Sequence, residues 1–162
     1  MLEKTYLTTT FGCFEITGSH LGISRVRLVD KKPCPETRVP DVLQNCVSQL
    51  KEYFAGERST FELKIDFGAA TPFNKSVWQE LIKTPYGHTT TYSAIAENIG
   101  NPPAVRAVGL ANRNNPIAII IPCHRCIAKS GELQGYFYGL DMKRKLLELE
   151  NPMSFASQGE LF

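Results

Sequence analysis

The first third of the chain alternates short β-like runs with glycines. Residues 4–10 and 23–29 are rich in Thr, Val, Ile and Leu, and Gly12, Gly18 and Gly22 lie between them in the manner of turn residues. These two runs predict strands of a small sheet.

A helical spacing begins after Pro40. Apolar side chains recur along one face from Val42 to Phe54, with Asp41 near the start and Gly56 just past the end. An acidic residue suits a helix N-terminus, and glycine suits the position beyond a C-terminus. The pattern therefore predicts an amphipathic helix that packs on the sheet.

A low-complexity joint then divides the chain. The stretch 60–67 alternates again, and residues 68–72 read Gly-Ala-Ala-Thr-Pro. We place the boundary in this joint, which gives an N-terminal domain over 1–71, a second domain over 72–152 and a tail over 153–162.

The spacing becomes helical beyond the boundary. One helical pattern runs from Phe73 to the helix-breaking residues 85–87, and two shorter ones span 92–99 and 104–111, separated by a glycine and two prolines. Helix, short turn, helix is a candidate for the helix-turn-helix motif of DNA-binding proteins. On this pattern alone, an ordinary helical hairpin is the commoner structure.

Small side chains distinguish the second helix of this pair. These small residues are Ala104, Ala107, Gly109 and Ala111. Side chains of this size would let a partner approach the helix backbone closely. Arg106 and Arg113 are its only charged residues. Arg106 lies off the apolar stripe, so we expect it to point outward, either as a solvated side chain or as a contact to a phosphate or a groove.

Composition bounds the class of protein. A chain of 162 residues that is 43% hydrophobic is long enough to bury a core. It contains no run approaching the roughly 20 apolar residues of a membrane span, and its N-terminus lacks the profile of a signal peptide. We therefore expect a soluble, cytoplasmic protein that does not bind membranes.

The cysteine count and the net charge add two expectations. Five cysteines make an odd number without a secretory context, which favours a reducing compartment and free thiols over a disulfide framework. The net charge of +2 is near neutral, so charge alone does not suggest a nucleic-acid partner.

The candidate chemistry lies at Cys123. An apolar run, 117–121, ends at Pro122, and Cys123 follows at once with His124 and Arg125 behind it. Cationic neighbours favour the thiolate form of cysteine, so the pattern predicts a nucleophile with a histidine base. Adjacent residues do not face each other, so His124 would act through a bridging water and would need a carboxylate to orient its ring.

Two alternative roles for this segment stay open. Cys123 and Cys126 form a C-x-x-C pair, which also occurs in redox proteins and in zinc sites. The remaining cysteines are scattered, and His20 and His88 are not spaced as a pair, so the sequence offers no convincing second half of a zinc site. A thioredoxin-like pair would stand near the start of a βαβ unit rather than after two helices.

The segment 121–125, Ile-Pro-Cys-His-Arg, resembles the signature of the O6-alkylguanine-DNA alkyltransferase family. Further landmarks of that family occur in the same order between residues 73 and 150: Pro85-Tyr86-Gly87, Thr91-Tyr92, Gly100-Asn101-Pro102, Arg106-Ala107-Val108-Gly109, Asn114-Asn115-Pro116, Gly135-Tyr136 and Gly139-Leu140. The first 70 residues agree with the family only in outline.

For the fold, the resemblance implies an α/β N-terminal domain that is ribonuclease H-like and a mainly α C-terminal domain with a winged-helix-like helix-turn-helix. For the function, it implies direct-reversal DNA repair, in which Cys123 accepts a methyl or other alkyl group from O6-alkylguanine, irreversibly and once per molecule. O4-alkylthymine is a further candidate substrate. We expect a monomer that binds the minor groove of double-stranded DNA and uses no cofactor and no metal.

The resemblance also implies a role for each catalytic residue. Cys123 would be the alkyl acceptor, His124 its water-mediated base, and Glu150 the carboxylate that orients the histidine. Asn115 would brace the active-site turn. Tyr136 would hydrogen-bond the guanine ring and help to neutralise it as it leaves.

DNA contacts are implied in the same way. Tyr92 would press on the phosphate next to the target nucleotide, and Arg106 would fill the stack that the flipped base has left. The other residues expected to bind DNA are Ala107, Gly109, Arg113 and Arg125.

Some positions depart from the family. Cys126 stands where members commonly carry valine, so we hypothesise that oxidation joins it to Cys123 and silences the protein. Phe137 and Tyr138 are bulkier than the residues that some members carry beside the pocket, which puts acceptance of large O6 substituents such as benzyl in question. His88 replaces a commonly acidic residue and receives no role.

Two competing functions must be weighed. An alkyltransferase-like protein that binds lesions without repairing them would lack the acceptor cysteine, so Cys123 argues against it. A thiol hydrolase would use Cys123 and His124, but it leaves Arg106, Tyr92 and the small-residue helix unaccounted for.

Overall fold

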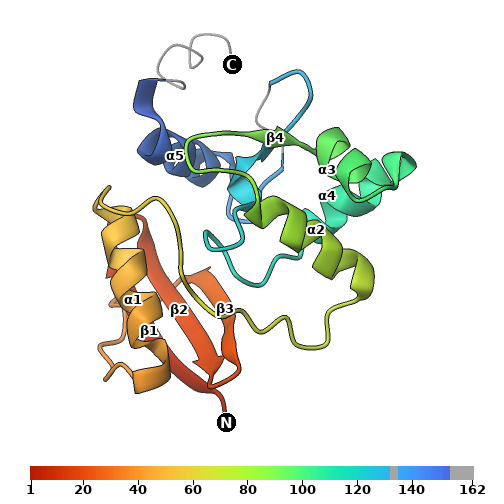
Figure 1. Ribbon diagram of the computed structural model, residues 1–162. Helices are drawn as coiled ribbons and strands as arrows, with labels where there is room; N and C mark the ends of the chain where they lie inside the picture. Colours follow the sequence, from red (N-terminus) through yellow and green to blue (C-terminus); the bar gives the residue numbers. More distant parts are fainter. Residues whose placement is uncertain (132–134, 154–162) are drawn as a thin grey trace. The chain divides into compact units, whose positions relative to one another are not determined.

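The computed structural model describes residues 1–131 and 135–153 (Figure 1). The chain forms two compact units. The N-terminal unit comprises Met1–Ala69 together with Pro116–Ile120, and the C-terminal unit comprises Ala70–Asn115 and the chain from Ile121 onward.

A three-stranded antiparallel sheet forms the base of the N-terminal unit. Its strands, in spatial order, are β1 (Glu3–Thr9), β2 (Gly12–Ser19) and β3 (Gly22–Val29). The two strands expected from the sequence are β1 and β3, whereas the central strand β2 was expected to be turns. Gly12 and Gly22, with φ of 129° and 130°, stand only at the first positions of β2 and β3. The residues between the two glycines include the buried Phe14 and Ile16, and they form the central strand of the sheet.

Helix α1 (Asp41–Phe54) packs against this sheet (Figure 1). It begins directly after Pro40 and ends before Gly56, as its apolar spacing predicts. The side chains that it buries include Leu43, Cys46, Leu50 and Tyr53. Burial of a large apolar side chain contributes about 1.5–3 kcal/mol, so this face holds the helix to the sheet.

Two further segments lie against the edge strand β3. The alternating stretch 60–67 is not a regular strand, because it makes a single bridge, between Ile65 and Ile23. A second bridge joins Val26 to Ile117. The residues that shortly precede the candidate nucleophile are therefore paired with the sheet.

A disulfide joins Cys13 to Cys34, whose Cα atoms are 5.4 Å apart. The odd cysteine count predicts free thiols, and for this pair the prediction is wrong. Cys13 is the cross-strand partner of Val29, the last residue of β3, and the chain continues from Val29 to Cys34. Strand pairing thus brings two cysteines that are distant in sequence within bonding reach. Cys46, Cys123 and Cys126 are free and buried.

Short helices build the C-terminal unit (Figure 1). They are α2 (Pro72–Ile82), α3 (Tyr92–Asn98), α4 (Val105–Arg113) and α5 (Leu140–Glu150), with the single-turn 3-10 helices η1 (Pro102–Ala104) and η2 (Cys123–Arg125). Strands β4 (Thr90–Thr91) and β5 (Cys126–Ile127) pair in parallel. An N-terminal sheet unit and a helical C-terminal unit are the coarse fold that the sequence predicts. Of the expected tail, 153–162, only Met153 lies within the described residues.

Threonine side chains start two of these helices. Thr71 Oγ1 accepts a hydrogen bond from Asn74 N at 3.2 Å, and Thr91 Oγ1 accepts one from Ala94 N at 3.0 Å. Such N-caps stabilise a helix by about 1 kcal/mol. The second cap fixes Tyr92 as the first residue of α3.

A tryptophan ties α2 to α4, since Trp78 Nε1 donates to Ala111 O at 2.8 Å. The helical spacing predicted over 104–111 rests on an apolar stripe of Ala104, Ala107, Val108 and Ala111, and of these Val108 and Ala111 are buried. Ala107 is exposed, so it belongs to the outward face and not to the stripe. Arg106 is exposed, as its position off the stripe predicts.

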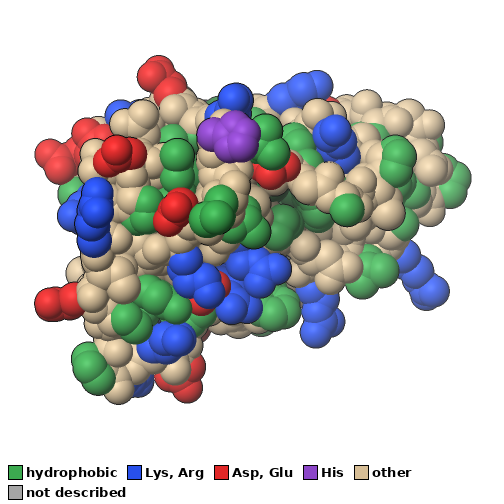
Figure 2. All heavy atoms as spheres, turned by 90° about the horizontal axis from the view of Figure 1, so that it is seen from below, with side chains coloured by type: hydrophobic (Ala, Val, Ile, Leu, Met, Phe, Trp, Pro, Cys, Tyr) green, Lys and Arg blue, Asp and Glu red, His purple; other side chains and the backbone are tan. Residues whose placement is uncertain are grey.

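Charged side chains of both signs share the face shown in Figure 2, in keeping with the near-neutral net charge. Within the described residues, no helix has the length and apolar character that a membrane span requires.

Candidate active site

Cys123 begins a tight turn, the 3-10 helix η2. Its backbone N donates to Ile121 O at 2.8 Å, and Arg125 N donates to Pro122 O at 3.0 Å. Just upstream, Ile119 has a φ of 73°, a left-handed conformation that is unfavourable for a β-branched residue. The chain thus reaches the turn through constrained backbone, and Cys123 is only 4% exposed.

Asn115 holds this turn from the end of α4. Its Nδ2 donates to Ile121 O at 2.8 Å and to Cys123 Sγ at 3.1 Å. Asn112, on the last turn of α4, donates from Nδ2 to Cys123 O at 3.4 Å. The two amides fix both the backbone and the sulfur of Cys123, so Asn115 lies where a brace of the turn should lie.

Burial raises the pKa of the Cys123 thiol. The hydrogen bond from Asn115, the charge of Lys143 and a hydrogen bond from Tyr136 act in the opposite direction and favour the thiolate. The expectation that His124 and Arg125 favour the thiolate stays a prediction.

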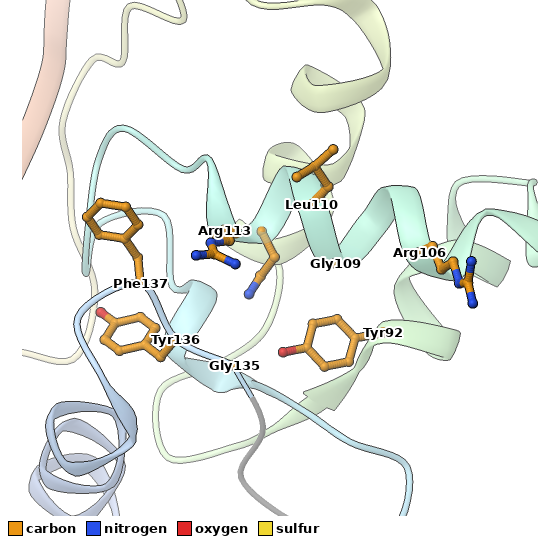
Figure 3. Close-up of a pocket in the computed structure, with 9 residues that line it drawn as sticks. Tyr92, Arg106, Gly109, Leu110, Arg113, Gly135, Tyr136 and Phe137 are labelled. Carbon is orange, nitrogen blue, oxygen red and sulfur yellow. The ribbon is translucent and has the colours of Figure 1, made fainter.

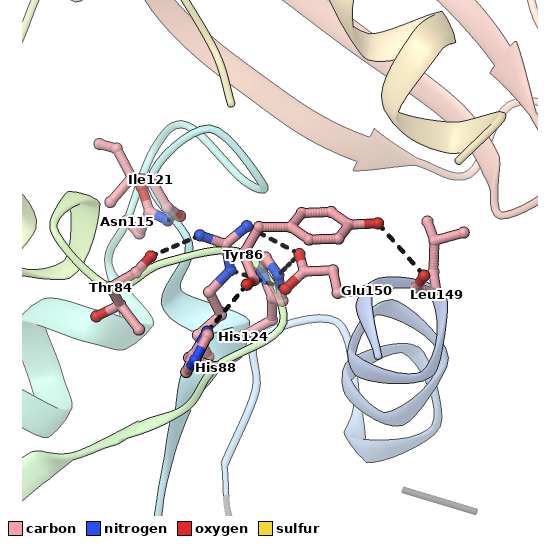
Figure 4. Close-up of polar contacts among 9 residues, drawn as sticks. Thr84, Tyr86, His88, Asn115, Ile121, His124, Leu149 and Glu150 are labelled. Atoms are coloured by element: carbon pink, nitrogen blue, oxygen red, sulfur yellow. Dashed lines mark hydrogen bonds and ion pairs between the residues drawn. The ribbon is translucent and has the colours of Figure 1, made fainter. Parts of the chain in front are cut away.

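Glu150, the last residue of α5, holds both residues that follow the thiol (Figure 4). His124 Nε2 donates to Glu150 Oε2 at 2.6 Å, while Arg125 Nε donates to Oε1 at 2.8 Å and its Nη2 to Oε2 at 3.1 Å. Burial raises the pKa of Glu150, but His124 and Arg125 more than offset this and lower it to about 2. The carboxylate is therefore ionised at neutral pH.

Arg125, which the resemblance assigns to DNA binding, has its side chain in the interior. Its side chain is 7% exposed, and its guanidinium donates to Glu150 and, through Nη1, to Thr84 O at 2.7 Å. The guanidinium also lies over the Tyr86 ring, 5.8 Å from the centroid. A guanidinium engaged in this way in the interior supports the site from within.

The second ring nitrogen of His124 is the unusual atom of this cluster. Nδ1 is buried and has no hydrogen-bond partner among the described residues. Burial lowers the pKa of His124 despite the opposing effect of Glu150, so the ring is neutral at pH 7. Because Nε2 faces the carboxylate, its proton stays there and Nδ1 presents a lone pair, as a base must.

A cavity of about 560 Å³ lies between α4 and the segment that begins at Gly135 (Figure 3), and Cys123 is not among its lining residues. Its lining residues are Tyr92, Arg106, Gly109, Leu110, Asn112, Arg113, Gly135, Tyr136 and Phe137. Figure 3 shows the side chains of α4 on one side of the cavity, with Tyr92 and Tyr136 across from them. Burial raises the pKa of Tyr136 well above its usual value, and its hydroxyl hydrogen-bonds Cys123. A protonated phenol therefore joins the cavity wall to the sulfur of Cys123.

Most of the residues predicted to bind DNA come together here. Tyr92, Arg106, Gly109 and Arg113 line the cavity with Tyr136. Ala107 is exposed on the same helix but does not line it.

Three residues that line the cavity or support the Cys123 turn were not identified from the sequence. Lys143 is fully buried, although its place in an amphipathic helix indicates a solvated residue. Asn112 likewise carries no signal in the sequence. Leu110 is 60% exposed at the cavity, and its position off the apolar stripe of α4 was a signal that could have found it.

Two of the positions that depart from the family are Cys126 and His88, and the structure shows their surroundings. Cys126 is buried, and burial raises the pKa of its thiol to about 12. His88 is exposed, with Nδ1 3.1 Å from Tyr86 O.

In the part of the chain that the structure describes, His, Cys, Asp and Glu side chains form no group of three or more that could hold a metal ion.

Two family descriptions match the chain. "6-O-methylguanine DNA methyltransferase, DNA binding domain" matches residues 72–152, and "6-O-methylguanine DNA methyltransferase, ribonuclease-like domain" matches residues 2–67. The match therefore extends over both units.

Curated relatives are similar over most of their length. A methylated-DNA--protein-cysteine methyltransferase from Mycolicibacterium paratuberculosis is 43% identical over 161 residues, which is 97% of this chain and 97% of that protein. A protein of the same name from Methanosarcina acetivorans is 59% identical over 102 residues, which is 63% of this chain and 65% of that protein.

Solved structures give the same result. The O6-methylguanine methyltransferase of Mycobacterium tuberculosis superposes with a TM-score of 0.81 at 40% identity, over 94% of each chain. The structure of Mycobacterium tuberculosis OGT in complex with DNA superposes with a TM-score of 0.81 at 41% identity, over 91% of each chain. On these matches, the chain belongs to the 6-O-methylguanine DNA methyltransferase family.

Proposed function

We propose that this chain repairs alkylated DNA by direct reversal, as a methylated-DNA--protein-cysteine S-methyltransferase that moves an alkyl group from O6-alkylguanine to Cys123. The observation that carries the proposal is the arrangement around the sulfur. A buried thiol held by Asn115 stands behind the wall of an open cavity. Directly after it comes a histidine whose buried Nδ1 has no hydrogen-bond partner among the described residues. A thiol so placed needs a substrate group that enters the cavity, which suits a base flipped out of the duplex.

The DNA-binding face consists of α3 and α4, used as a winged-helix-like helix-turn-helix with α4 in the minor groove. That groove is about 6 Å wide, so the exposed Ala107 and the half-buried Gly109 suit close approach of the helix. Arg106 fills the stack that the flipped base leaves, and Arg113 contacts the backbone at the cavity rim. Tyr92 lies across the cavity from α4, in a position to press on the neighbouring phosphate.

Proton removal comes first in the proposed reaction. A water between Cys123 Sγ and His124 Nδ1 carries the thiol proton to the imidazole, which becomes imidazolium. Glu150 accepts the hydrogen bond from Nε2 throughout and stabilises the positive ring. Asn115 holds the sulfur in place by its own hydrogen bond.

Alkyl transfer follows as an in-line displacement. The thiolate attacks the alkyl carbon while the bond from that carbon to O6 breaks, and guanine leaves with the electron pair. The raised pKa of Tyr136 keeps its hydroxyl protonated, so it donates a hydrogen bond to the departing ring. The product is a neutral thioether, a stable bond that leaves no thiol for a second transfer. Each molecule therefore acts once.

The test follows the alkyl group from labelled O6-methylguanine in duplex DNA. We expect label on the protein in a one-to-one burst, absent in Cys123→Ala and unchanged in Cys46→Ala, a matched variant of another buried free thiol. Binding without transfer would instead indicate a lesion-recognition protein. Release of label to water would indicate a thiol hydrolase.

Several finer points belong to the same proposal. We place the alkyl acceptor and the DNA-binding face in residues 72–152 and assign residues 1–71 no chemistry. Because the substrate is DNA, the protein acts inside the cell. It acts as a monomer, and sedimentation of the free protein and of its DNA complex checks this.

A further inference from the structure

Two buried side-chain atoms have no hydrogen-bond partner among the described residues, His124 Nδ1 and Asn112 Oδ1. The proposed reaction uses the first and leaves the second without a role. Asn112 is 4% exposed, and a buried acceptor without a donor costs free energy of folding, so folded proteins contain few of them. Such an oxygen indicates a donor that comes from outside the described chain.

The position of Asn112 shows where that donor would enter. The residue lies on the last turn of α4 and lines the cavity of about 560 Å³. Its Nδ2 donates to Cys123 O at 3.4 Å, which is longer than the usual range of about 2.7–3.2 Å. Because the terminal torsion of an asparagine side chain is broad, an amide held by one long hydrogen bond can turn its oxygen toward an occupant of the cavity.

The other polar side chains of the described cavity wall differ from Asn112. Arg106 and Arg113 can only donate hydrogen bonds. Tyr92 and Tyr136 carry hydroxyl groups, which donate as well as accept. Since Asn112 Nδ2 faces a carbonyl, Oδ1 is the free end of the amide and can only accept. Among the described side chains of the wall, Asn112 thus supplies the oxygen that requires a donor.

The base of the proposed substrate carries one donor that suits this oxygen. Alkylation at O6 removes the proton from N1 of guanine, so the amine at C2 provides the only N–H groups of the ring system. Guanine is also the base that presents an amine donor in the minor groove. The C2 amine and O6 are attached on either side of N1, and Asn112 contacts Cys123, whose sulfur attacks the O6 substituent in the proposed reaction.

We propose that Asn112 is a specificity-determining residue, whose Oδ1 accepts a hydrogen bond from the C2 amine of the flipped guanine. This inference rests on the proposed function for the identity of the base. Asn112 recognises the base itself, and the alkyl group takes no part in the contact. A base without the amine leaves the oxygen buried and unpaired, which is how a site rejects an analogue that lacks one N–H group.

The first test compares O6-methylguanine with O6-methylhypoxanthine, which lacks only the C2 amine, at the same position of the same duplex. The measured quantity is the ratio of the two single-turnover rates of methyl transfer to Cys123. We expect the unaltered chain to react about tenfold faster with O6-methylguanine. Equal rates would overturn the proposal, and this comparison needs no variant.

The second test repeats the comparison in two variants. Asn112→Leu is close to asparagine in shape and has no acceptor, and Asn114→Leu changes the exposed asparagine just beyond the same helix. We expect Asn112→Leu to bring the ratio close to one, while Asn114→Leu keeps the ratio of the unaltered chain. A displaced Cys123 turn would slow both substrates alike, and differences in base pairing are the same for every variant, so neither changes this comparison. A preference that survives in Asn112→Leu would assign the amine to another group and overturn the proposal.

The outcomes also separate this inference from the proposed function. Transfer from both bases at equal rates leaves the alkyltransferase activity in place and rejects the role of Asn112. Transfer from neither base, with the methyl group still in the DNA, rejects the proposed function and the role of Asn112 with it.

Discussion

Each unit of the chain buries a glutamate beside an arginine, and the two glutamates differ in what surrounds them. In the sheet, Glu15 accepts from its cross-strand neighbour Arg27 at 3.0 Å, but the Arg27 side chain is 46% exposed. In the helical unit, the partners of Glu150 are a 7% exposed arginine and the 0% exposed His124. In the first cluster the arginine reaches solvent, whereas the second is sealed and holds a histidine with one nitrogen that has no hydrogen-bond partner among the described residues.

The cysteine pairs differ in the same way. Cys13 and Cys34 are joined and lie beside paired strands, so their bond has a structural role. Cys123 and Cys126 are both free, and Cys123 alone accepts a hydrogen bond from Asn115. Reactivity in this chain therefore depends on the hydrogen bonds and charges around a residue. Residue type and spacing alone do not identify which cysteine is reactive.

The largest expected difference between the units comes from removing each carboxylate. Glu150→Gln leaves Arg125 and His124 buried without their anion, so we expect a loss of about 3–5 kcal/mol in the free energy of unfolding. Transfer should slow by about 10²–10⁴, the range of a lost acid–base group. The matched variant Glu15→Gln should cost about 1 kcal/mol or less. Urea unfolding and single-turnover kinetics measure both, and equal costs in the two units would contradict the comparison.

Lowering the pH should reveal the contribution of Glu150 to stability without a substitution. The pKa of Glu150 is lowered to about 2 in the folded chain, so its contribution to stability is complete above its unfolded pKa, near 4.3, and is lost as the pH falls toward 2. The contribution is about 3 kcal/mol. Urea unfolding between pH 6 and 2 should show this slope, and Glu150→Gln should lack it. A slope that persists in the variant would assign the effect to other carboxylates.

Reduction of the disulfide should separate stability from activity. The Cys13–Cys34 bond closes a loop with a sequence separation of 21 residues, for which the stabilisation is about 3 kcal/mol. We expect a thiol reductant to lower the unfolding temperature and leave the methyl-transfer rate unchanged while the chain stays folded. The double variant Cys13→Ser/Cys34→Ser should behave like the reduced chain and ignore the reductant. A loss of transfer in the folded, reduced protein would count against a purely structural role.

The amide brace should give the smallest of these effects. Asn115→Ala removes two hydrogen bonds from the Cys123 turn, so we expect a loss of about 1–2 kcal/mol and a transfer rate about tenfold lower. Asn114→Ala, at the exposed neighbouring position, is the control and should change neither quantity. Transfer that is unimpaired in Asn115→Ala would remove the residue from the site.

Oxidation of Cys123 with Cys126 stays a hypothesis. Peroxide would oxidise the two thiols to a disulfide and be reduced to water, which leaves no acceptor for the alkyl group. Mass mapping of peroxide-treated protein tests it, and unchanged activity without the bridge would reject it.

Local patterns predicted α1 to α4, because an amphipathic stripe is legible in the sequence, but the expected elements did not include α5. The spacing from Val42 to Phe54 and that from Phe73 to Ile82 correspond to α1 and α2 within a residue or two. Strand β2 was missed because Gly12 and Gly18 read as turns, although one begins the strand and the other lies at a register irregularity. The pairing of residues 116–120 with β3 depends on contacts distant in sequence, which no local pattern carries.

The sequence predicted which residues form the site, but it predicted less of their burial and their contacts. The signature and its landmarks located Cys123, Asn115 and Glu150, whose hydrogen bonds the structure describes. Burial is a property of the folded chain. The position of Arg106 off the apolar stripe indicated its exposure, but no pattern in the sequence indicated that Arg125 is buried and engaged. The sequence also could not reveal that Lys143 is buried, because a lysine in an amphipathic helix usually faces water.

Mass analysis of the chain after reaction with duplex DNA containing O6-methylguanine tests the central claim most directly. The account predicts that one methyl group appears on the peptide that carries Cys123 for each lesion removed, with Cys46 and Cys126 unmodified and guanine restored in the DNA. A methyl group on another residue, or release of the methyl group to water with Cys123 unmodified, would contradict it.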